Sequence, residues 1–139
     1  MIVRVYNRQR DVSVSLPWFR SKASLVAAYL RAKSQAIGIY FVTRKEIAEL
    51  HQRHFNDPTI TDCITLPILE DSYWGDIFIC PWVAKEYAEQ HRLEVQDEIL
   101  LYMIHGMLHL AGYDDQTPKE RARMRKKEKA CMKLCRDAE

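Results

Sequence analysis

The sequence of 139 residues lacks the features of membrane-spanning and secreted proteins. No run approaches the roughly 18 apolar residues that a transmembrane helix needs, and the opening MIVRVYNRQRD has no apolar segment typical of a signal peptide. The four cysteines include no C-x-x-C pair, which argues against a zinc ribbon. These absences predict a cytoplasmic protein with reduced thiols and no membrane partner.

An excess of charge of one sign is also missing. The net charge is +2, which is too small to indicate a nucleic-acid-binding protein by itself and does not exclude one. Hydrophobic residues make up 47% and charged residues 29%, a balance that allows an ordinary core. The length and the absence of repeats or linkers predict a single domain over residues 1–139.

Hydrophobic spacing predicts an α+β fold, a small mixed β-sheet packed by helices around one central buried helix. That helix is expected over 96–111, where apolar residues cover almost every face. Capping boxes at Thr43–Glu46 and Thr117–Glu120 mark the starts of two others. The expected strands are 2–6, 12–16, 37–43, 62–67 and 76–81, and the remaining helices are 21–35, 44–54, 81–91 and a last helix that follows Thr117.

Two histidines interrupt the apolar helix at metal-binding spacing. His105 and His109 are four residues apart, so their imidazoles lie on one face, one turn from each other. The alternative is a pair of core histidines, but each would then need its own buried hydrogen-bond partner, whereas one shared cation satisfies both. Gly112 allows a sharp turn, after which Asp114 and Asp115 can fold back to the same face. The pattern therefore favours a catalytic metal site with open positions.

The segment HGMLHLAGYDD resembles the motif H-G-x-L-H-L-x-G-Y-D-H of the YbeY family, metal-dependent endoribonucleases of ribosomal RNA maturation. TDCITLP and GDIFIC resemble two strand motifs of the same family, and the order of elements also fits. The resemblance implies a single-strand-specific endoribonuclease that acts in ribosome biogenesis. It further implies one Zn²⁺ per chain, with ribosomal RNA or the ribosome as partner and no expected DNA partner.

The resemblance also implies a ligand set. His105 and His109 match the first two metal histidines, and Asp115 occupies the position of the third. Asp114 occupies the family's own aspartate position and Glu98 that of a frequent family glutamate, so both are expected to support the ligands. A carboxylate ligand lowers the charge of the centre and makes the site harder, so other divalent ions become competitors.

The catalytic and RNA-binding groups are less directly indicated. The resemblance implies water activated by the metal as the attacking group, and the family has a Tyr-Arg pair at positions that are His54 and Phe55 here. Arg53 is the nearest arginine, although two positions along a helix it points in another direction. Arg44, Lys45 and Arg53 are the candidate RNA contacts. The basic run 121–129 is either a further contact or a solvated helix face, and Trp74 either stacks a base or packs.

Two other functions remain open at this stage. The spacing of histidines, glycine and aspartate also suggests a metzincin-like metallohydrolase or protease, but Gly106 occupies the position of the glutamate base in H-E-x-x-H enzymes. Losing such a base costs about 10²–10⁴-fold in rate. The third possibility is a non-catalytic ribosome-associated factor that uses its metal only for stability.

Overall fold

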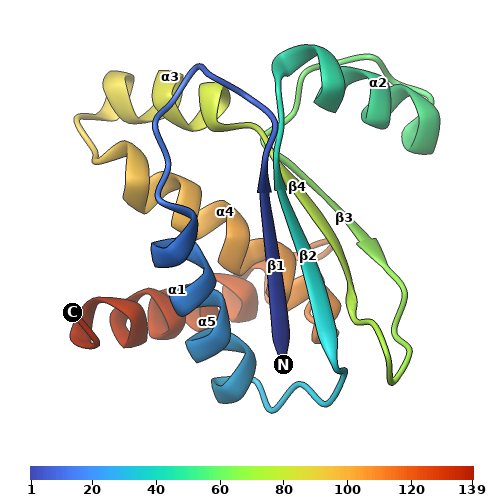
Figure 1. Cartoon of the computed structure of the whole chain (residues 1–139), viewed down its shortest axis with the longest axis vertical. Coiled ribbons are helices and arrows are strands. Elements are labelled where there is room, and N and C mark those ends of the chain that lie inside the picture. Colours follow the sequence, from blue (N-terminus) through green and yellow to red (C-terminus); the bar gives the residue numbers. More distant parts are fainter.

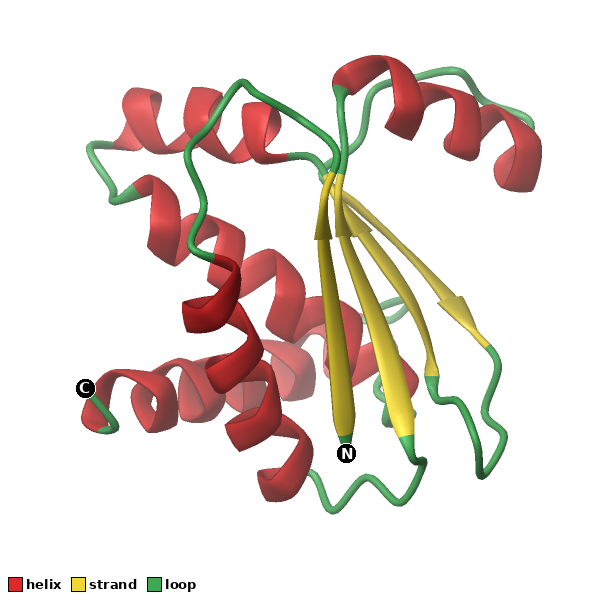
Figure 2. Cartoon of the chain, viewed as in Figure 1, coloured by secondary structure: helices red, strands yellow, loops and turns green.

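The computed structural model, which describes residues 1–139, contains one four-stranded mixed β-sheet (Figures 1 and 2). The strands are β1 (Ile2–Asn7), β2 (Ala36–Phe41), β3 (Cys63–Pro67) and β4 (Gly75–Ile79), in the order β1-β2-β4-β3. Strands β1, β2 and β4 are parallel, and β3 pairs antiparallel with β4. The expected α+β class with a small mixed sheet is confirmed.

Five helices accompany the sheet. They are α1 (Leu16–Tyr29), α2 (Arg44–Phe55), α3 (Pro81–His91), α4 (Val95–Leu110) and α5 (Pro118–Asp137). Figure 1 shows α1, α4 and α5 on one side of the sheet, whereas α2 lies apart from them, near the end at which β3 begins. No helix is both long enough and apolar enough to span a membrane.

The central helix α4 is buried on most of its faces. Ile104, Met107 and Leu108 are fully buried between the sheet and α1 and α5, as the apolar sequence predicts. A second, smaller apolar cluster joins α2 to the other face of the sheet through residues such as Ile47 and Phe78. The two clusters fix α2 and α4 relative to the sheet, which positions the site described below.

The predicted strand 12–16 is wrong, and the first helix begins earlier than expected. The Ser15 hydroxyl accepts a hydrogen bond from the Trp18 amide at 3.3 Å and caps α1, which therefore starts at Leu16 and ends at Tyr29. Val12, Val14 and Leu16 still pack against the core. Their alternation thus reflects the packing of a loop and not strand pairing.

The two predicted capping boxes differ in the structure. At α5 both halves are present, because Thr117 accepts from the Glu120 amide and Glu120 accepts from the Thr117 amide. At α2 only Thr43 caps, accepting from the Glu46 amide at 3.0 Å. The Glu46 carboxylate instead accepts a hydrogen bond from Arg8 at 2.8 Å.

Trp74 is buried in the main apolar cluster. Of the two roles that the sequence allows for it, base stacking and packing, the structure shows packing.

A buried lysine ties α1 to the end of α5. The Lys22 ammonium is 2.8 Å from the Cys135 carbonyl oxygen and 3.5 Å from the Glu139 carboxylate. Its side chain is 5% exposed. Lys22→Met should therefore destabilise the protein by about 1–3 kcal/mol, because it leaves a buried carbonyl without a donor. Chemical denaturation measures this loss, and the same change at exposed Lys33 is the control. Equal stability of the two variants would contradict a capping role for Lys22.

Candidate metal centre

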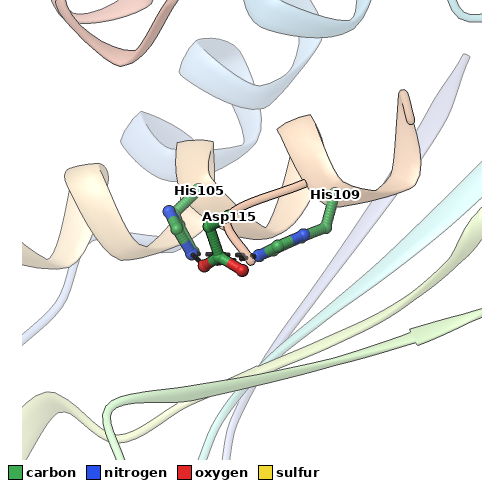
Figure 3. A group of neighbouring side chains, drawn as sticks. All are labelled: His105, His109 and Asp115. Atoms are coloured by element: carbon green, nitrogen blue, oxygen red, sulfur yellow. Dashed lines mark hydrogen bonds and ion pairs between the residues drawn. The ribbon is translucent and has the colours of Figure 1, made fainter. Parts of the chain in front are cut away.

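The two histidines of α4 and one aspartate of the following loop converge on one point (Figure 3). His105 and His109 project from the same face of the helix, and their Nε2 atoms are 3.0 Å apart. The Asp115 Oδ2 atom lies 3.5 Å from each of these nitrogens. Three potential ligand atoms thus form a nearly equilateral triangle.

Two standard helix-end motifs place Asp115 opposite the histidines. At the end of α4 the Gly112 amide donates to the His109 carbonyl, and the Tyr113 amide donates to the Leu108 carbonyl, each at 3.0 Å. Gly112 has a φ of 99°, a conformation that its missing side chain permits, as predicted. The capping box of α5 begins two residues after Asp115. The connecting loop is therefore held at both ends.

Further contacts hold the backbone of this loop. The Arg121 guanidinium donates to the carbonyl oxygens of Asp115 and Gln116, each at 3.3 Å. The Asp114 carboxylate accepts from the Asp115 amide at 3.2 Å. Asp114 itself is exposed and is not part of the three-atom cluster. The structure thus brings Asp115, and not Asp114, to the histidines.

The donor set suits a divalent ion such as zinc. Imidazole nitrogens and a carboxylate oxygen bind zinc at about 2.0–2.2 Å, which puts tetrahedral donors roughly 3.3–3.5 Å apart. The observed separations of 3.0 and 3.5 Å are close to these values. Three protein donors also leave at least one position open, as in catalytic zinc sites. The geometry therefore fits a divalent ion that keeps an open coordination position.

Glu128 of α5 contacts the opposite side of His105. Its Oε2 atom is 2.7 Å from His105 Nδ1, and its side chain is only 15% exposed. This hydrogen bond raises the pKa of His105 above its ordinary value and outweighs the opposing effect of burial. In the neutral ring, Nδ1 then carries the proton and Nε2 is free to bind a metal. The resemblance implied Glu98 and Asp114 as the supporting residues, and Glu128 is not among them.

Removing the Glu128 carboxylate should weaken metal binding. Glu128→Ala should lose about 10–100-fold in affinity, because His105 is then held neither in its tautomer nor in its orientation. Glu128→Gln keeps a hydrogen-bond acceptor but loses the charge, so its metal affinity should be intermediate between those of wild type and Glu128→Ala. Competition with a chelator of known affinity measures the change. Glu89→Ala, which removes an exposed carboxylate from α3, should bind metal normally. Wild-type affinity in Glu128→Ala would exclude the positioning role.

A cavity of about 540 Å³ opens over the three-atom cluster. Its wall is formed by α2, by β3, by the last two turns of α4 and by the loop after α4. The carboxyl-bearing lining residues are Asp62, Asp114 and Asp115, and no lysine or arginine lines the cavity. Cys63 also lines it, but burial raises the pKa of this thiol well above its ordinary value. Its sulfur is not among the three ligand atoms that converge, which are those of His105, His109 and Asp115.

The predicted RNA contacts lie elsewhere on α2. The Arg44 guanidinium stacks over the Trp82 ring at 4.4 Å and is 3.9 Å from the Asp11 carboxylate. Lys45 and Arg53 line a separate groove along α2. The face of α2 that lines the cavity instead carries His51 and Phe55. The structure thus does not bring the basic residues of α2 together with the histidine pair.

Two other expectations concern α4 and α5. Glu98 is buried and lines a different groove, between α4 and α5, and burial raises the pKa of its carboxyl. Along α5, Met124, Cys131 and Cys135 pack into the core. Most of the basic residues between them are exposed, as expected of a solvated helix face.

Gly106 has no room for a side chain. A Cβ atom at this position would lie 2.8 Å from Ile77 and 3.0 Å from Thr65, because α4 packs closely on β3 and β4 here. The position at which zinc proteases of the H-E-x-x-H type carry their glutamate base therefore faces the sheet and not the cavity. A glutamate at this position would have to displace the side chain of Ile77 or Thr65.

The chain is similar to proteins named endoribonuclease YbeY. The family model with that description matches residues 4–136. The protein of that name from Protochlamydia amoebophila is 39% identical, with 83% of this chain and 80% of the relative covered. The one from Chlamydia felis is 33% identical over 97% of this chain and 91% of the relative. The solution structure of TM1509 from Thermotoga maritima has a TM-score of 0.70 and 25% identity, with 96% of this chain and 89% of that chain covered.

Proposed function

The chain belongs to the YbeY endoribonuclease family, and from this we propose that it is a metal-dependent hydrolase that cleaves single-stranded RNA. We propose that ribosomal RNA is its substrate, during ribosome maturation in the cytoplasm, and that one Zn²⁺ per chain is its cofactor. The observation that carries the proposal is the convergence of His105, His109 and Asp115 within the segment that resembles the family motif. Residues 1–139 are proposed to act as one domain.

The chain's own residues would prepare this site before RNA arrives. His105 and His109 would present their Nε2 atoms to the ion, with the His105 ring oriented by Glu128. Asp115 would be the third ligand, held by the two helix-end motifs and by Arg121. When bound, a divalent ion supplies Lewis acidity, which activates water and neutralises charge on the scissile phosphate. Gly106, the residue after His105, has no side chain and so cannot supply the general base that H-E-x-x-H enzymes carry at this position.

The experiment that tests this proposal compares two forms of one RNA. Zinc-loaded protein is incubated with a fluorescently labelled ribosomal RNA fragment, either single-stranded or annealed to its complement. We expect internal cleavage of the single strand and little cleavage of the duplex. A chelator should stop the reaction and added Zn²⁺ should restore it.

The same preparation distinguishes the alternatives. Cleavage of an unfolded protein substrate but not of RNA would support a metalloprotease, which the packing of Gly106 opposes. Metal binding without any cleavage would support a non-catalytic factor. Cleavage that continues in chelator would show that the activity does not depend on the metal.

A further inference from the structure

The cavity over the histidine pair offers no cationic side chain to an RNA phosphate. Three of its lining residues carry carboxylates, Asp62, Asp114 and Asp115, and none is a lysine or arginine. A divalent ion adds two positive charges, which do not outweigh three carboxylates. Proteins that bind single strands combine positive charge with aromatic stacking. With so little positive charge here, stacking should carry more of the recognition.

Two large aromatic side chains line the cavity, and the exposed one is placed for that task, whereas Tyr113 is half-buried and packs against the main apolar cluster. Phe55, the last residue of α2, lines the cavity and is 56% exposed. The other three phenylalanines, Phe19, Phe41 and Phe78, are at most 8% exposed. Phe55 belongs to neither apolar cluster, so packing does not account for it.

The position of the Phe55 ring is supported by its neighbours. His51 lies one turn earlier on α2 and also lines the cavity, and its ring centroid is 5.2 Å from that of Phe55. His51 Nδ1 is 3.1 Å from the Thr59 carbonyl oxygen, which restrains the imidazole. Asn56 then ends the helix in the left-handed conformation, with φ 56°. The two neighbouring rings thus form one aromatic part of the cavity wall.

We propose that Phe55, supported by His51, is a stacking platform for one unpaired base of the RNA next to the linkage to be cleaved. This inference rests on the proposed function, and it identifies Phe55 as the residue that selects single-stranded RNA at the site. A base inside a duplex is covered on both faces and cannot stack on Phe55, so the platform favours single strands. Stacking of a base on an aromatic ring contributes about 5–150-fold in affinity, by the measured effect of alanine substitution.

Binding of a short labelled RNA to metal-loaded protein tests the proposal. Rapid-mixing fluorescence anisotropy reads the affinity before cleavage proceeds. Phe55→Ala should lose about 5–150-fold, and Phe55→Leu, which is apolar but has no π face, should lose nearly as much. Phe55→Trp should bind at least as well as wild type. Tyr87→Ala removes an aromatic residue of similar exposure from α3, outside the cavity, and should change nothing. All variants should keep their full metal content.

Two further measurements identify the contact as stacking. RNAs that lack a single base are bound to wild type and to Phe55→Ala, with the gap moved along the strand. At one position the missing base should weaken binding to wild type but not to Phe55→Ala, because the same contact is already absent. Phe55→Arg should instead add one contact to an RNA phosphate. The slope of the logarithm of the RNA-binding constant against the logarithm of the salt concentration should then become steeper by about 0.7.

The outcomes separate this inference from the proposed function. If Phe55→Leu binds as wild type does, or if no position shows the shared loss, the stacking platform is refuted even though RNA is cleaved. If RNA binds through Phe55 but is not cleaved, the platform stands and the nuclease proposal fails. If wild type binds no RNA, both are refuted.

Discussion

His109→Ala should empty the metal site and abolish RNA cleavage. The substitution removes one of three donors, and two donors alone hold a divalent ion weakly. Metal assistance contributes several kcal/mol to the transition state of such hydrolyses, so the rate should fall by at least about 10³-fold. Elemental analysis of the purified variant measures the metal, and cleavage of labelled single-stranded RNA measures the rate. His109 is a cleaner choice than His105, whose loss would also leave Glu128 without its partner.

His54, which lies outside the metal site, provides the matched histidine control. His54 lies on α2, is exposed and does not line the cavity, so His54→Ala should keep both metal and activity. A full equivalent of metal in His109→Ala would show that the ion binds elsewhere. Loss of metal with undiminished cleavage would show that the RNA cleavage comes from another site or from a contaminating nuclease.

The sequence predicts the local parts of this site because they depend on short spacings. Histidines four residues apart share a face in any helix, and a glycine after them allows the chain to turn back. The positions of His105, His109 and Gly112 therefore followed from the helix alone. The resemblance to the YbeY family, confirmed by the family match, added the choice of Asp115 over Asp114.

The hydrogen-bond partner of His105, Glu128, could not be predicted from short spacings. Glu128 lies 23 residues after His105, on the next helix, and the two meet only because α5 packs against α4. Glu128 lies four residues after Met124 and three before Cys131, so helical spacing places it on the same face of α5 as these buried residues. Only the fold shows which residue of α4 this face meets, and therefore that Glu128 reaches His105.

For helix α2, too, the sequence does not show which face meets the cavity. Positive charge predicts Arg44, Lys45 and Arg53 as RNA contacts, but the orientation of the helix decides which side chains meet the cavity. His51 and Phe55 share one face at a spacing of four, which the sequence does show. That this face is the one directed to the cavity depends on how α2 docks on the sheet through Ile47 and Leu50.

Substitutions at Asp115 and Asp114 should show which aspartate is the metal ligand. The other possible roles of these residues are to support the loop or only to solvate the turn. Asp115→Ala should lose more metal affinity than the roughly 10–100-fold expected for supporting residues, because it removes a donor directly. Asp114→Ala should lose less, since the Asp114 carboxylate only accepts a 3.2 Å hydrogen bond from the Asp115 amide. Metal content and chelator competition measure both variants.

Asp115→His completes the series, because it restores the donor that the family motif carries at this position. The loop is held by Arg121 and by both helix ends, so the new imidazole should still be directed toward the two histidines. A neutral ligand in place of a carboxylate raises the charge of a divalent centre by one, so Asp115→His should bind metal and cleave RNA at a lower pH than wild type does. An empty site in Asp114→Ala together with a full site in Asp115→Ala would reverse the assignment, and Asp114 would then be the ligand. Retention of metal in both alanine variants would mean that neither aspartate binds it, and that the two acids serve only the turn between α4 and α5.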